Sequence, residues 1–346
     1  MAIPSFFPGA ELSAAFYTEV VRPLLKGQPH AAALLGWGSD VLEYDTTRST
    51  DHGWGPRLLV FLDDHDGIDE LNRLLDIRLP ERFRGWPVRF GWDEVEAMHH
   101  VTVTTLSSWL LDQLGVDPTL GMSVLDWLLT PQQRLLGVVA GAVHADDSGA
   151  LGEVRQTLSW YPDPVWRWVI ACQWHRIAQE EAFVARAAEV GDELGSRVTA
   201  VRLVRDMMHL ALLLERQYAP YQKWLGSAFA RGPHADNLPG DLADVLDARH
   251  VAARETALAV AYAALARRHN DTGVTGPLDP AIVTYHERPA RVLMADRFSE
   301  ACLATVDEPT LRGRPLIGTV DQIVDNTDVL SSPRRYRHLA ALYEPG

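Results

Sequence analysis

The sequence predicts a mixed α+β protein, with an N-terminal mixed sheet flanked by helices and a C-terminal all-α helical bundle. Three observations predict this fold class. Strand patterns alternate with helical patterns over residues 9–150, whereas residues after about 153 carry almost only helical periodicity. Asp, Ser and Gly residues also cluster at 146–152, as expected at a boundary. With 346 residues, the chain is long enough for two domains, predicted at 1–150 and 151–346.

The clearest strand of the N-terminal domain is predicted at residues 57–62. Its sequence, RLLVFL, is apolar on both faces, so we expect it at the centre of the sheet. Residues 101–104 are β-branched throughout and predict another strand. The remaining segments are predicted as helices over 11–26, 66–79, 109–114, 123–129 and 131–140, and as strands over 86–91 and 141–146.

The C-terminal domain is predicted to consist of long helices joined by short connections. In the second of them, Leu203, Met207, Leu210 and Leu214 recur at helical spacing, which predicts one buried face. Long antiparallel helices with short connections are typical of a bundle. The predicted helices cover residues 164–190, 196–218, 241–268 and 289–306.

Composition and charge exclude several classes of function. The chain has 32 basic and 46 acidic residues, a net charge of −14, which argues against general binding of nucleic acid or anionic membranes. No run of 18 apolar residues occurs, and the first residues lack the pattern of a signal peptide, so no membrane span is expected. Only Cys172 and Cys302 are present, which is typical of a reducing compartment. We therefore expect a cytoplasmic protein.

A small-residue turn followed by an acidic residue and a strand is the first candidate site. The turn is Gly36-Trp37-Gly38-Ser39, and Asp51 follows it twelve residues after Ser39. Such a turn exposes backbone N–H groups, and a serine hydroxyl adds a donor for a phosphate. A carboxylate close to the next central strand suits a divalent cation that bridges phosphates. At the start of that strand, Arg57 is expected either to hold a phosphate or to pair with Asp51.

Taken together, these residues resemble the nucleotidyltransferase-fold superfamily, whose pattern is a Gly-Ser turn, a spacer, and Asp-x-Asp entering an apolar strand. The string Ser-Thr-Asp-His-Gly-Trp-Gly-Pro-Arg, residues 49–57, is more narrowly similar to the DUF4037 family of uncharacterised bacterial proteins. Strings at residues 160–162, 191–195 and 218–226 also resemble that family. The resemblance covers most of the chain to about residue 310.

The resemblance implies a specific activity. Proteins of the superfamily transfer a nucleoside monophosphate from a nucleoside triphosphate, such as ATP, to an acceptor, with Mg²⁺ as cofactor. Mapped onto this chain, Gly38 and Ser39 would hold the phosphates and Asp51 would be a catalytic metal ligand. Arg57 would stabilise charge on the transferring phosphoryl group. The acceptor and the general base are not indicated.

One position departs from the superfamily pattern. The second carboxylate of Asp-x-Asp is expected at position 53, where this chain has glycine. The acidic residues that could replace it are Asp40, Asp45, Asp63 and Asp64, and those that could supply a third carboxylate are Asp93, Glu94 and Asp146. Gly53 keeps open a second hypothesis, a catalytically degenerate module that binds a nucleotide or a partner. A purely structural helical interaction protein is a third.

An aromatic turn near Lys223 is the second candidate site. Lys223 lies among Tyr221 and Trp224, and Tyr218 precedes them. The ammonium could contact a triphosphate while a base stacks on Tyr218 or Tyr221, or the segment could be a packed interhelical turn with Lys223 in solvent. In the first case, the nucleotide would lie between the two predicted domains.

A basic stripe on the predicted helix over 196–218 leaves two interpretations open. Arg202, Arg205, His209 and Arg216 lie roughly on one helical face. They line a cleft for an anion, or they pair with Asp192, Glu193 and Asp206.

Overall fold

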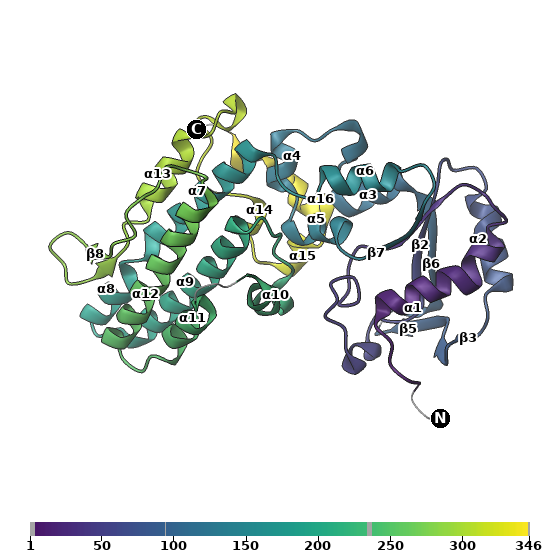
Figure 1. Ribbon diagram of the computed structural model, residues 1–346, viewed down its shortest axis with the longest axis horizontal. Coiled ribbons are helices and arrows are strands. Elements are labelled where there is room, and N and C mark those ends of the chain that lie inside the picture. Colours follow the sequence, from purple (N-terminus) through teal and green to yellow (C-terminus); the bar gives the residue numbers. More distant parts are fainter. Residues whose placement is uncertain (1–3, 94, 234–236, 345–346) are drawn as a thin grey trace. The chain divides into compact units, whose positions relative to one another are not determined.

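The computed structural model describes residues 4–93, 95–233 and 237–344 (Figure 1). Contacts divide the chain into two compact units. The sheet unit comprises Met1–Met122 and Gln133–Ser159, and the helical unit comprises Ser123–Gln132 and Trp160–Gly346. The mixed α+β class predicted from the sequence is confirmed, with a five-stranded sheet in the first unit and mostly helices in the second.

The division of the chain differs from the predicted boundary after residue 150 at two segments. Helix α6 (Ala150–Thr157) belongs to the sheet unit, because Arg155 donates to the carbonyls of Val138, Val139 and Ala140 at the end of α5. Helix α4 (Val124–Leu129) belongs to the helical unit, where Arg337 forms a 2.7 Å ion pair with Asp126. The chain therefore crosses between the units more than once.

The sheet has the strand order β5-β6-β2-β1-β7, with β2 at its centre as predicted. Strand β2 pairs in parallel with β6 and antiparallel with β1, so the sheet is mixed. A short β3-β4 ribbon stands beside it. The strands are β1 (Ala31–Leu34), β2 (Arg57–Leu62), β3 (Arg82–Phe83), β4 (Trp86–Pro87), β5 (Arg89–Trp92), β6 (Val95–Thr105) and β7 (Ala142–Asp146).

Helices pack against both faces of this sheet because β2 is apolar on both sides. Leu58, Val60 and Leu62 belong to one core cluster with residues of α1 (Gly9–Phe16) and α2 (Ile68–Arg78). Phe61 points to the other face and packs edge-on against Trp109 of α3 (Leu106–Leu114), with ring centroids 5.5 Å apart. Alternation of side chains along a strand requires this arrangement. Strand β2 is therefore packed on both of its faces.

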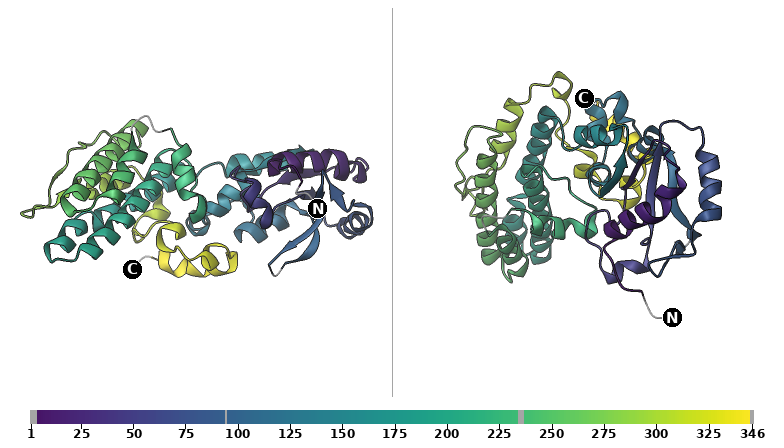
Figure 2. Two further views of the ribbon diagram at one scale, coloured as in Figure 1. Left: turned by 90° about the horizontal axis from the view of Figure 1, so that it is seen from below. Right: turned by 45° about the vertical axis from the view of Figure 1, so that its right-hand side comes forward.

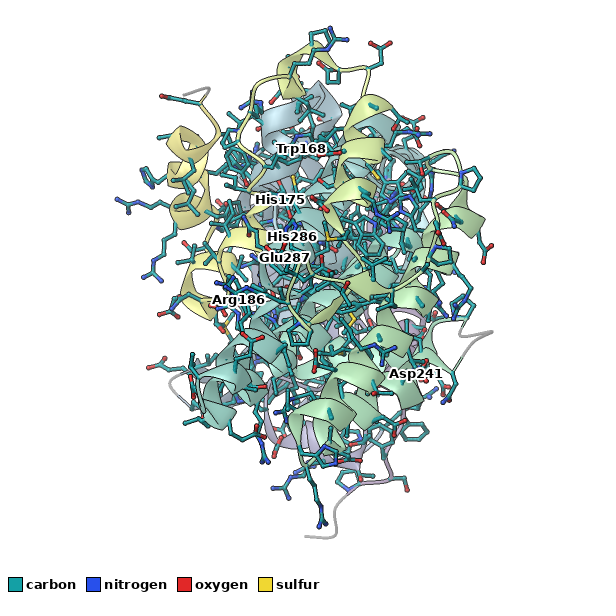
Figure 3. The ribbon with its side chains drawn as sticks, turned by 90° about the vertical axis from the view of Figure 1, so that its left-hand side faces the viewer. Trp168, His175, Arg186, Asp241, His286 and Glu287 are labelled. Atoms are coloured by element: carbon teal, nitrogen blue, oxygen red, sulfur yellow. The ribbon has the colours of Figure 1, made fainter. Side chains whose placement is uncertain are left out.

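The helical unit is built from helices that lie side by side in both views of Figure 2. Trp168 and Trp174 on α7 (Asp163–Glu180) are among its largest fully buried side chains, and Trp168 is labelled in Figure 3. In the described residues, none of the helices combines the length and apolar character needed to cross a bilayer. The principal helices are α7 (Asp163–Glu180), α8 (Phe183–Glu189), α9 (Glu193–Leu214), α11 (Leu238–Asp247), α12 (Val251–Thr272) and α13 (Asp296–Ala304).

Two of the predicted long helices are wrong, because each is broken into two. The predicted helix over 164–190 breaks after Glu180, where the buried Glu181 carboxylate accepts the N–H groups of Leu293 and Ala295. The predicted helix over 241–268 breaks before Val251, where the His250 side chain accepts the N–H of Ala253 and begins α12. A long-range contact of Glu181 accompanies the first break and a side-chain cap accompanies the second, and neither break contains proline or glycine.

Shorter elements complete the two units. Among them, α14 holds Gln322, whose amide donates to the Val169 carbonyl of α7 at 3.2 Å. These elements are α5 (Gln132–Val139), α10 (Leu225–Arg231), β8 (Val283–Thr284), β9 (Arg291–Val292), α14 (Val320–Ile323), α15 (Thr327–Leu330) and α16 (Pro333–Arg337).

Glu181 makes the stability of the fold depend on pH. Burial raises the pKa of its carboxyl from 4.5 to about 7, and the N–H groups of Ala295 and Leu293 offset part of that rise. The folded chain therefore holds the proton to a higher pH than the unfolded chain, and ionisation between pH 4.5 and 7 opposes folding. In Glu181→Gln, which cannot ionise, this loss disappears. Denaturant unfolding at pH 5 and pH 8 should show the variant gaining up to about 3 kcal/mol on the natural protein.

A constant difference between the two proteins at both pH values would contradict that account of Glu181.

Candidate functional site

The Gly36–Ser39 turn follows β1 and is fixed by close backbone packing. Gly36 and Gly38 have φ values of 96° and 126°, which glycine adopts without strain. The N–H of Gly36 donates to the Gly137 carbonyl of α5 at 2.8 Å. A Cβ on Gly38 would lie 2.6 Å from Arg57 Nη2, so only glycine lets the turn approach that side chain this closely. The structure thus brings Gly38 and Arg57 together.

Arg57 and Asp40 form a buried bidentate ion pair beside this turn. Arg57 Nη2 donates to Asp40 Oδ1 at 2.7 Å and Nε donates to Oδ2 at 3.2 Å. The two residues are only 8% and 2% exposed. Nη2 also donates to the Trp37 carbonyl at 2.9 Å, and the guanidinium carbon lies 4.6 Å from the centre of the Trp37 ring. The expectation that Arg57 pairs with Asp51 is wrong, because Asp40 takes that place.

The turn retains donors that nothing in the described residues uses. No hydrogen bond there involves the N–H of Trp37, Gly38 or Ser39, or the Ser39 hydroxyl. Arg57 Nη1 is likewise outside the contacts with Asp40 and Trp37. Backbone N–H groups, a hydroxyl and a guanidinium are the donors with which proteins hold phosphate oxygens. The predicted roles of Gly38, Ser39 and Arg57 in phosphate binding stay predictions.

The histidine opposite Arg57 has a lowered pKa and adds no second positive charge at neutral pH. His100 lies opposite Arg57 in the β2–β6 register and donates from Nε2 to the Phe90 carbonyl at 2.9 Å. Burial lowers the pKa of His100, and the charge of Arg57 lowers it further. At neutral pH, Arg57 is therefore the fixed positive charge at this end of the strand.

Asp51 ends a short 3₁₀ helix, Thr47–Asp51, ahead of β2. Its side chain is 64% exposed and lies 3.7 Å from Arg48 Nε, a distance at which an exposed pair contributes little. With residues 50 and 52–55 it lines a small crevice of about 110 Å³, whose other lining residues are Trp86, Pro87, Phe90 and Gly91. The crevice is smaller than a nucleotide, so the wider surroundings of the turn must hold most of any such ligand.

The missing second carboxylate is a structural feature and not only a sequence difference. Gly53 has a φ of 60°, and a Cβ there would lie 2.7 Å from the Trp37 ring. Trp37 also packs against Trp92, with ring centroids 5.7 Å apart, and Trp92 packs against His52. Aromatic side chains therefore occupy the space that the second acid would need.

The acidic residues considered as replacements are engaged elsewhere or exposed. Asp40 is paired with Arg57, and Asp45 accepts the N–H groups of Gly9 and Trp54. Asp63 and Asp64 are exposed at the far end of β2 from the turn.

The candidates for a third carboxylate differ from one another in position. Asp93 pairs with His52 at 3.2 Å, whereas Asp146 accepts N–H groups at the start of α6. Glu94 lies outside the described residues. Throughout the described ranges, no group of three or more His, Cys, Asp or Glu side chains is placed to hold a metal ion. The residues present therefore do not fit the two-carboxylate Mg²⁺ site that the resemblance implies.

The second candidate site belongs to the helical unit. Tyr218 is only 5% exposed, and its ring packs on Trp160 and Tyr161 with centroids 4.7 and 5.2 Å away. Burial raises the pKa of Tyr218 far above its usual range. Lys223 is exposed and its Nζ lies 4.9 Å from the centre of the Trp224 ring. This packing gives Tyr218 little surface for a base, and the predicted roles of Tyr218 and Lys223 in nucleotide binding stay predictions.

Sequence reasoning missed two features of the sheet-unit site. It named Trp37 only as part of the turn, and it considered Asp40 only as a metal ligand. One signal in the sequence could have identified the ion pair: an acid directly follows the turn, and an arginine stands at the start of an apolar strand. Two opposite charges close to a core are expected to pair, because burying either charge alone is costly.

Part of the chain is similar to a known protein family. Residues 127–225 match the family model described as "Domain of unknown function (DUF4037)", which confirms the predicted resemblance over that segment. The crystal structure of a nucleotidyltransferase-like protein from Exiguobacterium sibiricum 255-15 is similar to this chain, with 12% identity and a TM-score of 0.33. That similarity covers 86% of this chain and 89% of the other. No curated protein matches significantly.

A carboxylate restored at position 53 tests whether the aromatic packing excludes it. We expect Gly53→Asp to lower the free energy of unfolding by about 1–3 kcal/mol beyond the cost of backbone strain, because the side chain meets Trp37. Gly191→Asp is the matched control, since Gly191 has a φ of 77° and open space around its Cβ position. Denaturant unfolding of both variants gives the comparison.

Equal destabilisation in the two variants would show that Trp37 moves aside easily and that the site can accommodate a second acid.

Proposed function

We propose that the sheet unit binds the phosphate groups of a nucleotide on the Gly36–Ser39 turn, as a binding module and not as a Mg²⁺-dependent transferase. The observation that carries this proposal is the set of unused donors on the turn, held beside the paired Arg57. The turn is partly exposed, so these donors are accessible, and consecutive backbone N–H groups with a hydroxyl form the kind of concave surface that binds anions.

The exposed Trp37 ring supports a nucleotide over a simple anion. Trp37 is 49% exposed although it is a large aromatic side chain next to the turn. Its carbonyl and ring both contact Arg57, so phosphate donors and an aromatic surface are adjacent. An exposed indole offers a face on which a base can stack without reading its identity. We therefore expect weak discrimination between nucleotides.

Nucleotidyl transfer from a nucleoside triphosphate to an unknown acceptor is the second candidate function. One observation favours it: the Asp51 side chain is 64% exposed, and the contact recorded for it in the described part of the chain is a long one to Arg48, so its carboxylate is accessible. Against it stands Gly53 at the position of the second carboxylate, where a Cβ would lie 2.7 Å from the Trp37 ring. The two candidates differ in whether the triphosphate is cleaved.

Nucleotide binding without metal is the first test. We expect ADP to bind in the presence of EDTA, and Arg57→Gln to weaken that binding about tenfold or more, because a charged hydrogen bond contributes about 1.5–3 kcal/mol. Ser39→Ala should weaken it less, since it removes one neutral donor. Arg48→Gln is the control, because Arg48 is 93% exposed and contacts Asp51 instead of the turn. Isothermal titration calorimetry gives each affinity, and equal affinities in all variants would contradict the proposal.

Cleavage of the triphosphate is the second test. With ATP, Mg²⁺ or Mn²⁺, and candidate acceptors, we expect no pyrophosphate release from the natural protein, and unchanged nucleotide affinity in Asp51→Ala. Release that disappears in Asp51→Ala would establish the transferase and overturn the binding module.

A further inference from the structure

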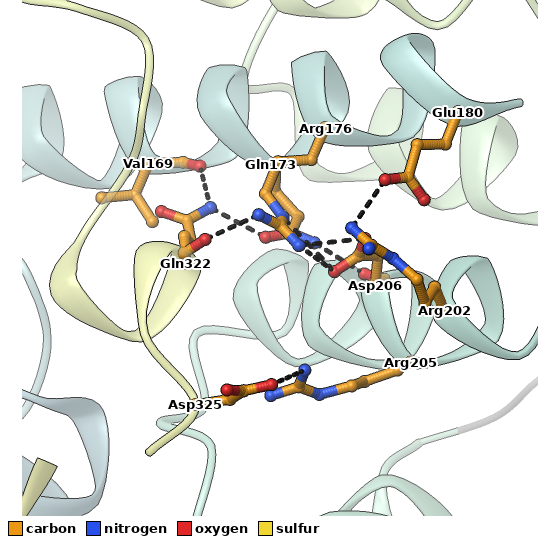
Figure 4. Close-up of polar contacts among 9 residues, drawn as sticks. All are labelled: Val169, Gln173, Arg176, Glu180, Arg202, Arg205, Asp206, Gln322 and Asp325. Carbon is orange, nitrogen blue, oxygen red and sulfur yellow. Dashed lines mark hydrogen bonds and ion pairs between the residues drawn. The ribbon is translucent and has the colours of Figure 1, made fainter. Parts of the chain in front are cut away.

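A polar cavity of about 240 Å³ lies within the helical unit, and none of the residues proposed to bind the nucleotide lines it. Its walls come from α7, α9 and the segment around α14. Figure 4 shows Arg176 of α7 beside Arg202 and Arg205 of α9, with Asp325 opposite. Three guanidinium groups around one cavity are unusual in a chain with a net charge of −14. The cavity therefore has the positive groups that an anionic ligand would need.

Two of these arginines are held by carboxylates inside the unit. Arg176 donates to the buried Asp206 at 3.1 Å and to the Gln322 carbonyl at 2.6 Å. Arg202 donates to Glu180 at 2.6 Å. The arginines of the basic stripe therefore pair with acidic residues other than the Asp192, Glu193 and Asp206 considered from the sequence. Arg216, the last residue of that stripe, contacts Asp163 and the Trp166 ring and does not line the cavity.

Arg205 keeps part of its guanidinium unused. Its Nη1 lies 3.3 Å from Asp325, whose side chain is 72% exposed. Its Nε is buried and has no hydrogen-bond partner in the described residues, and no hydrogen bond uses Nη2. The edge formed by Nε and Nη2 is the one that binds two oxygens of a carboxylate or phosphate side by side. Arg205 thus keeps an unpartnered edge, with a buried Nε, in the wall of the cavity.

His209 supplies a second unused polar atom at the same place. It follows Arg205 by one helical turn on α9, and its Nε2 is also buried without a partner. Burial, with the charges of Arg205 and Arg176, lowers the pKa of His209 to about 3, so the ring is neutral. Buried polar atoms without partners are rare in native proteins and commonly mark a missing ligand or water.

The acidic residues of the cavity favour a ligand that both accepts and donates hydrogen bonds. Asp206 and Asp321 line the cavity together with the arginines. A simple oxyanion without a proton would be repelled by these carboxylates, whereas the monoanion of a phosphate monoester, whose second pKa is about 6, keeps a hydroxyl that can donate to them. The volume of about 240 Å³ also leaves room for a small organic group attached to the phosphate.

We propose that this cavity binds a small phosphate monoester, whose oxygens accept from the open edge of Arg205 and contact His209. The ligand would use Nε and Nη2 of Arg205 and leave the Nη1 contact with Asp325 in place. The cavity lies wholly within the helical unit, and the proposal does not depend on nucleotide binding by the sheet unit.

Calorimetric titration of the full chain with glycerol 3-phosphate tests this proposal, with glycerol and sulfate as comparison probes. Arg205→Gln should weaken binding of glycerol 3-phosphate about ten- to a hundredfold, as expected for loss of charged hydrogen bonds. Arg205→Lys keeps the charge without the fork and should weaken it less. Arg312→Gln is the matched control, because Arg312 pairs with Asp307 at the same 3.3 Å but does not line the cavity.

Arg57→Gln separates this site from the one proposed in the sheet unit. A site for glycerol 3-phosphate that survives Arg57→Gln and is lost in Arg205→Gln supports the proposal. Binding that is lost only in Arg57→Gln, equal binding of sulfate, or no binding of the phosphate monoester would overturn it. Thermal unfolding of Arg205→Gln close to that of Arg312→Gln shows that the variant is folded.

Discussion

The buried ion pair between Arg57 and Asp40 is the interaction on which the sheet-unit site depends. It joins the first residue of the central strand to the residue directly after the Gly36–Ser39 turn. Removing two charges from water is costly, and good geometry with further hydrogen bonds is needed to offset that cost. The bidentate contact and the bond to the Trp37 carbonyl supply that geometry. The pair is thus a positioning device whose loss leaves a buried charge.

This pair also lies beside the position of the missing second acid. Arg57 contacts Asp40 and Trp37, and the Trp37 ring also lies close to Gly53. The rings of Trp37, Trp92 and His52 then occupy the space of the second acid that the resemblance implies. A chain that replaces a carboxylate by glycine and fills the space with indole rings has lost one requirement of two-carboxylate metal sites. It has kept the donors that hold an anion.

The sequence predicted features that depend on local pattern. The central position of β2 followed from its two apolar faces, and the mixed class followed from alternating periodicities. It did not predict the Arg57–Asp40 pair, because the two residues are 17 positions apart across a loop whose path no periodicity determines. The break after Glu180 was missed for a related reason: Glu181 is turned inward by N–H groups of residues 293 and 295, more than 100 positions away.

The cavity of the helical unit shows the same limit. The stripe on α9 was visible in the sequence, but Glu180 and Asp325, the partners of Arg202 and Arg205, lie 22 and 120 positions away from them. A basic stripe and a ligand cavity cannot be distinguished until those segments are placed. Both proposed sites therefore rest on polar groups that the fold leaves without partners, one on backbone donors and the other on side chains.

Metal-free ADP affinity of Asp40→Asn, measured by calorimetry, tests the central claim most directly. Removing a negative charge next to the turn should strengthen anion binding if electrostatics alone decides. The positioning account gives the opposite result: Asn cannot hold the guanidinium of Arg57 through two charged oxygens, the turn loses its geometry, and ADP binds more weakly. Unchanged or tighter binding by a folded Asp40→Asn protein would contradict the account.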